Sequence, residues 1–424
     1  MTNSDNLSGL LVSRRAALKL GVLGVAGLAI PGCTQESTFE PRPFVAQGLS
    51  PDSAAWRDLR THFNILPDVR YMNNASIGMP PAIVSKAVAD GYRAQSEDPI
   101  QAKHDLQDRI RDASLPALGR FFGVHADEIT LTRNASVALH LQAVGLDLRA
   151  GDHVVITTQE HPAGRKPWQF RETRHGVDVT EVFIPSPLPS IDEIISRFEE
   201  AVGPRTRAIA FCHVTRGGHL YPVKELCSWA RGRGLSTLVD GAQAVGQFNI
   251  NLGDLGCDTY SASLHKWTLA PCGTGFLYVR QDARDRFHSS FEPDKGSFSF
   301  GIPGTADFPI RAAVATAIEF MESIGMDQVE ARCRHLSEHL KASLEVEDVV
   351  TLLSGERERS APGSTIFEID GVDAIEAVDR LAEQNIHIDE HQRDGHNAIR
   401  ISTHIYNSTD DVDAAVEALL TMRV

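Results

Sequence analysis

Two residues of complementary chemistry, Asp240 and Lys266, each follow an apolar segment of the kind that forms a buried strand. Asp240 comes directly after residues 235–239, and Lys266 comes four residues after the segment 259–262. Read alone, Asp240 would be a helix cap or a turn residue. A lysine, however, is rarely buried without a partner, and a buried lysine can lose its proton and attack a carbonyl carbon. A carboxylate at one strand end and an amine near the next therefore indicate a site for a pyridine cofactor that carries an aldehyde.

The elements that would hold these residues follow from an alternation of short apolar segments with helical patterns. This alternation predicts βαβ units and an α/β fold with a mainly parallel central sheet flanked by helices. In such sheets ligands bind at the carboxyl ends of the strands. Strands are expected at residues 129–132, 153–157, 181–184, 208–213, 235–239, 259–262 and 275–279, with helices at 136–146, 190–202 and 223–233.

The pattern changes after about residue 310. Long amphipathic helices are expected at 310–324 and 326–344, and shorter strands and helices follow them. The sequence therefore predicts a large domain at 56–310 and a smaller α+β domain at 311–424. The shorter elements of the smaller domain are strands at 364–369 and 398–402 and helices at 374–384 and 410–422.

Composition excludes some classes of function. The 424-residue chain has a formal net charge of −15, which argues against a nucleic-acid partner because phosphate binding needs clustered Lys and Arg. Its six cysteines show no CxxC spacing, so no zinc site and no disulfide framework is expected.

The N-terminus resembles a twin-arginine export signal. Arg14 and Arg15 precede an apolar run at 20–30, which is too short to span a bilayer as a helix. Residues 30–32 before Cys33 resemble a lipobox, although Pro31 fits that pattern poorly, so lipid anchoring through Cys33 and simple cleavage nearby both stay open. We expect a signal at 1–33, a linker at 34–55, and export to the periplasm.

Seven segments in order also resemble the class V aminotransferases, and the similarity is greatest to the isopenicillin N epimerase-like branch. The resemblance covers the chain from about Tyr71 to its C-terminus. It implies fold type I of the pyridoxal 5'-phosphate (PLP) enzymes, with the cofactor as a Schiff base on Lys266. The segments are YMNNASIGMPP at 71–81, TRNASVAL at 132–139, EHPAGRKPW at 160–168, HVTRGGHLYPV at 213–223, DGAQAVGQFNINLGDLGCDTYSASLHKWTLAPCGTGFLYV at 240–279, GTAD at 304–307 and IRISTHIYN at 399–407.

The resemblance also implies roles for single residues. Asp240 would keep the ring nitrogen protonated, and His161 would stack on the ring, although without the family it would be a loop histidine that caps a turn. The backbone at the start of a helix, where N–H groups are free, would hold the phosphate. The other cofactor contacts implied are Ala135, Ser136, Ser263 and His265 at the phosphate and Gln243 and Thr215 at the ring hydroxyl, where many relatives carry Asn in place of Thr215.

Two further residues concern the partner subunit and the substrate. Thr305 would reach the phosphate of the neighbouring subunit, which implies a homodimer; otherwise it is a loop residue. Arg400 would bind the substrate carboxylate through two parallel hydrogen bonds; in an unknown fold it would be a surface ion-pair residue.

The chemistry expected is proton removal from Cα of an amine, with the freed Lys266 as base. Aminotransferase-like chemistry ranks first and an epimerase or a lyase close behind, because no second base is visible in the sequence. A cysteine desulfurase is disfavoured because no cysteine follows Cys333. A non-catalytic binder and a nucleotide-binding enzyme are weaker alternatives, since the site residues are intact and the turn 271–275 lacks a P-loop ending. Export favours a small-molecule or peptide amine found outside the cytoplasm as the substrate.

Overall fold

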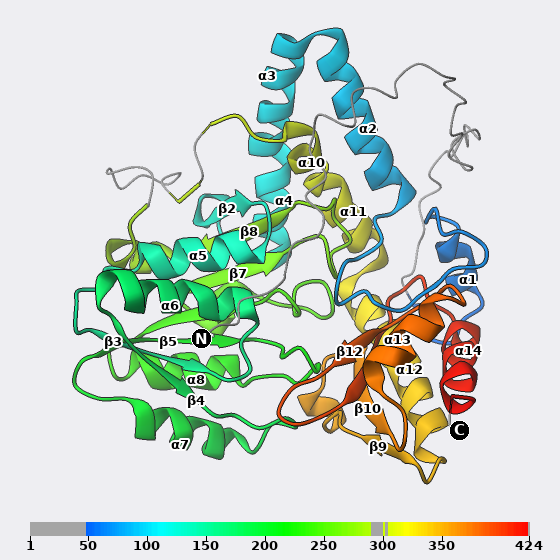
Figure 1. Ribbon diagram of the computed structural model, residues 1–424. Helices are drawn as coiled ribbons and strands as arrows, with labels where there is room; N and C mark the ends of the chain where they lie inside the picture. The colour runs from blue at the N-terminus through cyan, green and yellow to red at the C-terminus, as the bar shows by residue number, and fades with distance from the viewer. Residues whose placement is uncertain (1–47, 290–299, 302–303, 423–424) are drawn as a thin grey trace, which may run out of the picture. The chain divides into compact units, whose positions relative to one another are not determined.

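A seven-stranded mixed sheet forms the centre of the protein (Figure 1). The computed structural model describes residues 48–289, 300–301 and 304–422. Within the sheet β7, β6, β5, β3 and β4 run parallel, and only β8 runs antiparallel to both of its neighbours. The predicted α/β fold with a mainly parallel sheet is confirmed. The order is β2 (Ile129–Thr132), β8 (Gly275–Val279), β7 (Thr259–Ser263), β6 (Ser236–Asp240), β5 (Thr206–Cys212), β3 (His153–Thr157) and β4 (Asp178–Val182).

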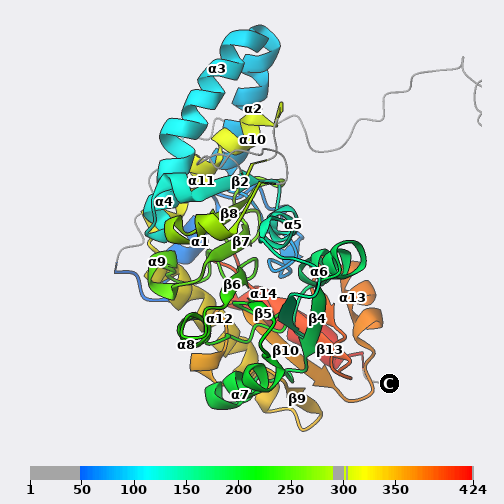
Figure 2. The ribbon, with the colours of Figure 1, turned by 90° about the vertical axis from the view of Figure 1, so that its left-hand side faces the viewer.

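Helices cover both faces of this sheet, which is why its central strands are apolar throughout (Figure 2). On one face α5 (Ala135–Gly145) and α6 (Pro162–His175) pack against residues such as Ala210. On the other face α7 (Ile191–Ala201) and α8 (Val223–Arg231) pack against the alternate residues of the same strands. The two clusters fix the strands from both sides and leave the carboxyl ends free to build a site.

A second, four-stranded antiparallel sheet lies in the C-terminal part of the chain. Its own apolar core joins the sheet to three helices. The sheet has the order β12 (Asp389–His391), β13 (Ala398–Ser402), β10 (Ser364–Ile369) and β9 (Val350–Leu352), and the helices are α12 (Met326–Glu345), α13 (Ala374–Ala382) and α14 (Thr409–Leu420).

The N-terminal segment joins the C-terminal part of the fold. β1 (Arg70–Tyr71) pairs with β11 (Ile386–His387), and Asn73 forms a bridge with Ser402. Residues just after β1 therefore run between the C-terminal sheet and the loop that carries Lys266.

The remaining helices connect these parts. α2 and α3 extend away from the sheets at the top of Figure 1. The elements are α1 (Ala55–Arg60), α2 (Ala82–Glu97), α3 (Pro99–Arg109), the π-helix η1 (Ile110–Ser114), α4 (Leu115–Phe122), α9 (Leu252–Leu255), α10 (Phe308–Ala312), α11 (Val314–Ile324) and the 3₁₀ turns η2 (Ala126–Glu128), η3 (Gln281–Arg286) and η4 (Arg357–Arg359).

The structure corrects two of the predicted elements. The helix expected at 310–324 is two helices, α10 and α11, which meet at Ala313; the Ser114 hydroxyl lies at this junction, within hydrogen-bond distance of the carbonyl oxygens of Arg311 and Ala312 (3.0 and 3.2 Å). The strand expected at 181–184 is β4 at 178–182, since its partner β3 ends opposite Val182.

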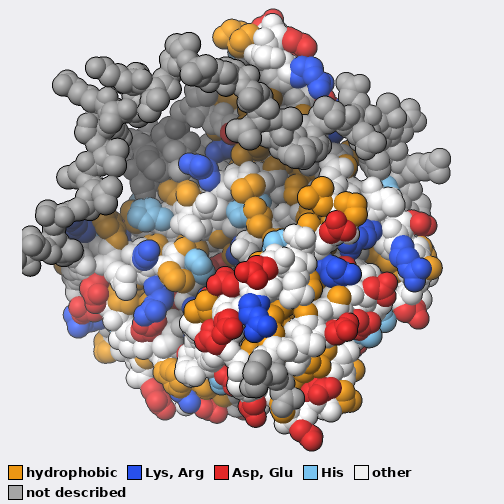
Figure 3. Space-filling view, turned by 45° about the vertical axis from the view of Figure 1, so that its right-hand side comes forward, with side chains coloured by type: hydrophobic (Ala, Val, Ile, Leu, Met, Phe, Trp, Pro, Cys, Tyr) orange, Lys and Arg blue, Asp and Glu red, His pale blue; other side chains and the backbone are white. Residues whose placement is uncertain are grey.

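The N-terminal predictions can be followed only in part. The export signal, Cys33 and the first residues of the linker lie outside the described residues. Helix α1 begins at Ala55, the last residue of the predicted linker. In the described part of the chain, no helix is both long enough and apolar enough to cross a membrane. Figure 3 shows acidic and basic side chains interspersed over one face of the molecule.

Candidate active site

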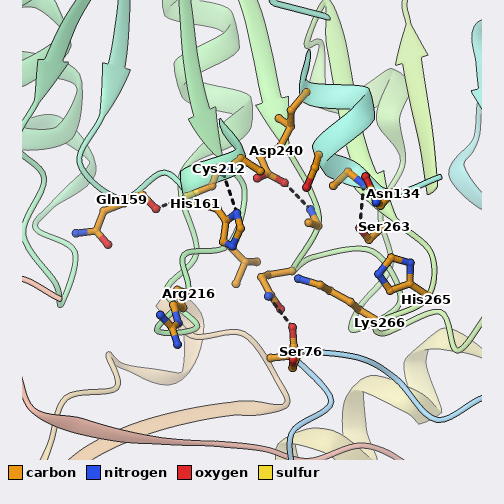
Figure 4. A pocket seen from close by; sticks show the side chains of 18 of the residues that line it. Ser76, Asn134, Gln159, His161, Cys212, Arg216, Asp240, Ser263, His265 and Lys266 are labelled. Atoms are coloured by element: carbon orange, nitrogen blue, oxygen red, sulfur yellow. Dashed lines mark hydrogen bonds between the residues drawn. The ribbon is translucent and has the colours of Figure 1, made fainter. Parts of the chain in front are cut away.

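A cavity of about 380 Å³ opens at the carboxyl ends of β5, β6 and β7, where the sequence places the site (Figure 4). Most of the predicted residues meet there: Ala135, Ser136, His161, Asp240, Gln243, Ser263, His265, Lys266 and Arg400. The cavity wall also contains residues that the sequence did not single out, namely Ala75, Ser76, Asn134, Leu139, Gln159, Ala163, Cys212, Val214, Arg216, Ala242 and Asp389.

Lys266 lies on the connection between the antiparallel strands β7 and β8, and its backbone is fixed by distant segments. Asn74 donates its amide to the Lys266 carbonyl (3.4 Å), and the Gly78 N–H donates to the His265 carbonyl (2.8 Å). His404 contacts the Trp267 carbonyl through Nε2 (3.0 Å). The backbone around Lys266 is therefore fixed by segments that come both before and after it in the sequence.

Gly78 is the closest of these contacts, and replacing it should displace the lysine. A Cβ atom at position 78 would lie 1.8 Å from the carbonyl oxygen of Lys266, where no side chain fits. We expect Gly78→Ala to lower stability by about 1–3 kcal/mol and to reduce cofactor loading. Thermal unfolding and cofactor absorbance measure the two effects. Gly203→Ala is the matched control because its Cβ atom would meet nothing within 4 Å; equal effects of both changes would contradict the prediction.

Burial changes the acidity of Lys266. Desolvation lowers the pKa of its ammonium group to about 8, Arg400 lowers it as well, and the Asp240 carboxylate opposes the change. No hydrogen bond to Nζ is formed within the described residues, so the amine is free to react. The neutral amine is the form that attacks an aldehyde, and the lowered pKa makes far more of it present near pH 7 than in an ordinary lysine.

This acidity can be measured in the cofactor-free protein. Because only the neutral amine reacts, we expect labelling of Lys266 by an amine-directed reagent to reach half its maximal rate near pH 8. In Asp240→Asn the midpoint should move to lower pH, because the carboxylate that stabilises the ammonium form is gone. Peptide mass spectrometry across a pH series measures both, and a midpoint near that of surface lysines would contradict the assignment.

Asp240 ends β6 at the floor of the cavity and is buried. Its Oδ1 accepts the Ala242 N–H (2.9 Å), while its Oδ2 accepts no hydrogen bond within the described residues. Burial raises the pKa of Asp240, and both the Ala242 hydrogen bond and Lys266 lower it. A carboxylate with one open oxygen in a desolvated wall is suited to pair with a protonated ring nitrogen.

Helix α5 begins at the wall of the cavity. The Asn134 side chain caps the helix by accepting from Val137 (2.9 Å). The Ala135 N–H donates to Ser263 Oγ (2.9 Å), so this amide already has a partner in the protein, and its contact with a phosphate stays a prediction. Accepting that bond leaves the Ser263 hydroxyl proton free to donate, and Ser136 is exposed at the helix start.

His265 and Gln243 are each oriented by one or two neighbours. His265 Nδ1 lies 2.9 Å from the Thr274 carbonyl oxygen, so Nδ1 carries the proton and Nε2 is left for a ligand. The Gln243 amide donates to Ala75 (2.9 Å) and accepts from Trp267 (2.9 Å). Gln243 thus lines the cavity with both ends of its amide fixed.

His161 lies across the cavity from Lys266 (Figure 4). Its Nδ1 accepts the N–H of Ala163 (3.1 Å) at the start of α6. His161 therefore caps this helix, as expected without the family resemblance, and its ring also lines the cavity. Desolvation lowers the pKa of His161 to about 4, and Lys266 adds to the effect. The ring is therefore neutral at pH 7 and carries its proton on Nε2.

Arg400 closes the substrate side of the cavity, and its charge is already paired. It forms a short ion pair with Asp389 and donates to the Arg216 carbonyl (3.3 Å). Burial lowers the pKa of Arg400 to about 10, and Asp389 opposes this. Arg216 in turn pairs with Glu390 (2.7 Å) and lies 3.7 Å from Asp389.

Two predicted contacts lie outside the cavity wall. Thr215 is buried and its hydroxyl accepts the His219 N–H (3.1 Å), while its neighbours Val214 and Arg216 line the cavity instead. Thr215 itself does not line the cavity, and its contact with the ring hydroxyl stays a prediction. Thr305 is exposed near the start of α10, and its contact with a second copy of the chain stays a prediction.

Two of the missed residues had a usable signal. Cys212 ends β5, and Arg216 comes four residues later, so a systematic search after every strand would have found both. Asp389 had none, because it meets Arg400 only through the register of β12 and β13.

The polar groups match a phosphorylated pyridine aldehyde at three points. Lys266 offers a free amine, Asp240 an open carboxylate oxygen, and the start of α5 with the Ser263 hydroxyl a set of donors for a phosphate. All three groups line the same cavity. The residues present therefore fit pyridoxal phosphate.

Comparisons with known proteins agree with this geometry. The family profile described as aminotransferase class-V matches residues 70–415. Isopenicillin N epimerase of Amycolatopsis lactamdurans is 30% identical over 87% of this chain and 98% of its own, and that of Streptomyces clavuligerus is 29% identical over 86% and 98%. Among solved structures, a C-DES mutant with glycine covalently linked to the PLP cofactor has a TM-score of 0.78 at 23% identity, covering 85% of this chain and 98% of that one. A cysteine desulfurase from Thermococcus onnurineus has a TM-score of 0.77 at 22% identity, covering 86% and 97%.

Proposed function

The chain belongs to the class V aminotransferase family of PLP-dependent enzymes, and from this premise we propose that it moves a proton at Cα of an amino-acid-type amine, with aminotransferase-like chemistry as the outcome. The observation that carries the proposal is the free amine of Lys266 facing the open carboxylate of Asp240 in one desolvated cavity. When bound, pyridoxal phosphate supplies the electron sink that makes a Cα proton removable.

The protein supplies the proton transfer and the surroundings. Lys266 Nζ removes the Cα proton and can return it to another carbon, and its pKa near 8 suits a base at neutral pH. Asp240 Oδ2 would accept a hydrogen bond from the protonated ring nitrogen. His161 covers the opposite wall and limits the entry of water.

A single base favours transamination over epimerisation. Epimerisation by two bases needs an acid on the wall opposite Lys266. His161 stands there, but its Nδ1 is occupied by the Ala163 amide and its pKa is far below neutrality. His161 is therefore suited to stack on the cofactor ring and to exclude water, and not to donate a proton to Cα.

An epimerase is the second candidate, and a different observation favours it. The two isopenicillin N epimerases match almost the whole of their own length at 29–30% identity. A PLP-dependent lyase would use the same first step and differ only in the leaving group.

Sulfur transfer finds little support in the cavity. Cys212 does line the wall, but its thiol is buried, and desolvation together with Glu160 raises its pKa well above the ordinary value. A sulfur acceptor must be a thiolate. The thiol contacts the Gln159 carbonyl oxygen (3.8 Å) and is suited to packing.

Export, assembly and substrate are also part of the proposal. The Arg14–Arg15 signal supports twin-arginine export to the periplasm, with lipid attachment at Cys33 as one outcome. A homodimer with Thr305 at the neighbouring site follows from the family resemblance. An exported enzyme would meet amines outside the cytoplasm, which favours a peptide that carries an amino-acid terminus.

Product analysis in deuterated water tests the reaction class. Purified enzyme is incubated with a panel of extracellular amines and amino-acid-bearing peptides, and products are identified by mass spectrometry. Transfer of the amino group to the cofactor supports aminotransferase-like chemistry. Deuterium at Cα with retained nitrogen would establish epimerisation, and loss of a β-substituent would establish a lyase. Turnover of free cytoplasmic amino acids alone would count against the peptide substrate.

A further inference from the structure

The position at which Arg400 would bind a substrate carboxylate is occupied by the carboxylate of Asp389. Asp389 and Arg400 stand directly opposite each other on β12 and β13, and their side chains form a short ion pair. Both residues line the cavity. The Arg400 side chain is 3% exposed and that of Asp389 is 23% exposed, so Asp389 is the more accessible member of the pair.

The terminal nitrogens of Arg400 are both engaged in the free enzyme. Its Nη2 donates to Asp389 and, at 3.5 Å, to Asn73 Oδ1, its Nη1 donates to the Arg216 carbonyl (3.3 Å), and its Nε is buried without a partner. A carboxylate that binds guanidinium through two hydrogen bonds needs two neighbouring N–H groups. Nη2 belongs to either such pair, so an incoming carboxylate can bind in this way only when Asp389 has left Nη2.

A second arginine stands ready to receive Asp389. Arg216 Nη2 lies 3.7 Å from Asp389 Oδ1, and both residues line the cavity. A small rotation of Asp389 would exchange its pairing with Arg400 for a pairing with Arg216. Asp389 would keep a cationic partner, and no carboxylate would be left unpaired in the wall.

We propose that Asp389 is a specificity-determining residue: it holds Arg400 in the free enzyme and moves onto Arg216 when the carboxylate of the substrate arrives. The inference rests on the proposed function in taking that substrate to be an amine with a carboxylate. Each new ion pair replaces an existing one, so the carboxylate alone adds little affinity. Selectivity then favours substrates whose remaining parts make further contacts and disfavours small free amino acids.

Binding of propionate to the holoenzyme tests the exchange without turnover. Propionate presents the carboxylate alone, and propionamide is its uncharged counterpart. We expect Asp389→Asn to bind propionate about tenfold more tightly than the unmodified protein, because no carboxylate of the protein then competes for Arg400. Binding of propionamide should not change. Isothermal titration calorimetry measures both.

Glu390→Gln is the matched control. Glu390 carries the same charge one residue away and pairs with Arg216, but it does not line the cavity. Its change should alter propionate affinity by less than about twofold. Equal tightening in Glu390→Gln and Asp389→Asn would show a general charge effect and overturn the proposal, as would unchanged or weaker propionate binding in Asp389→Asn.

Arg216→Met provides an independent variant if Asp389→Asn fails to fold. Without the receiving arginine, Asp389 stays on Arg400, and propionate should bind more weakly than to the unmodified protein. Unchanged binding in this variant would overturn the exchange. The outcomes are separate from those of the proposed function, since a protein without cofactor on Lys266 could still show the expected propionate affinities, and an active enzyme could lack them.

Discussion

Lys266→Ala is expected to abolish covalent retention of the cofactor and to lower turnover by about a thousandfold or more. Within the described residues of the cavity wall, Lys266 is the only lysine, and its lowered pKa makes its amine reactive. Borohydride treatment of the unmodified protein should fix the cofactor to the peptide that contains this residue. In the variant that peptide should stay unlabelled, while the phosphate donors near α5 still allow reversible binding.

The control for this experiment is Lys224→Ala, in which an exposed lysine of α8 is removed. It should keep the absorbance, the borohydride adduct and the turnover of the unmodified protein. If Lys266→Ala still yielded a fixed cofactor at the same peptide, the assignment of this lysine would fail.

Asp240→Asn is expected to leave cofactor attachment intact and to reduce turnover by about a hundredfold to ten-thousandfold. An amide cannot keep the ring nitrogen protonated as a carboxylate does, so the electron sink weakens. The Ala242 N–H can still donate to the amide oxygen, so the fold around β6 should be preserved. Steady-state kinetics and cofactor absorbance separate the two effects.

Glu160→Gln is the informative comparison for Asp240→Asn. Glu160 is also buried, and desolvation together with Asp240 raises its pKa to about 8, so it is mostly neutral at pH 7. Its Oε1 accepts from Thr157 (2.8 Å) and from the Cys212 N–H (3.0 Å), and a glutamine oxygen can accept the same bonds. Turnover should change by only a few-fold. A comparable loss in both variants would indicate a general need for buried polarity instead of a specific role for Asp240.

The parts of the site that sequence could predict are those fixed by local order. Asp240 and Ser136 are placed by a strand end and a helix start, and both features are visible as apolar segments and capping residues. Lys266 could be placed for the same reason, since it follows β7 closely. Chain order alone brings such residues to one edge of a parallel sheet.

The substrate side could not be predicted because it depends on contacts between distant segments. The pairing of Arg400 with Asp389 is set by strand register, which the sequence does not display. Thr215 shows the finer limit: its neighbours Val214 and Arg216 line the cavity, whereas Thr215 itself does not. Likewise, the junction between α10 and α11 is contacted by Ser114, almost two hundred residues away.

The three contacts that hold the backbone at Lys266 come from Asn74, Gly78 and His404, which are up to about three hundred residues apart in the sequence. A nascent chain that has emerged only as far as the lysine has its nucleophile but not the His404 contact that fixes it. Vitamin B6 should consequently be captured firmly only after the segment around His404 has been synthesised. Bound vitamin would then mark a chain that extends past this histidine, and fragments that end before it would stay colourless.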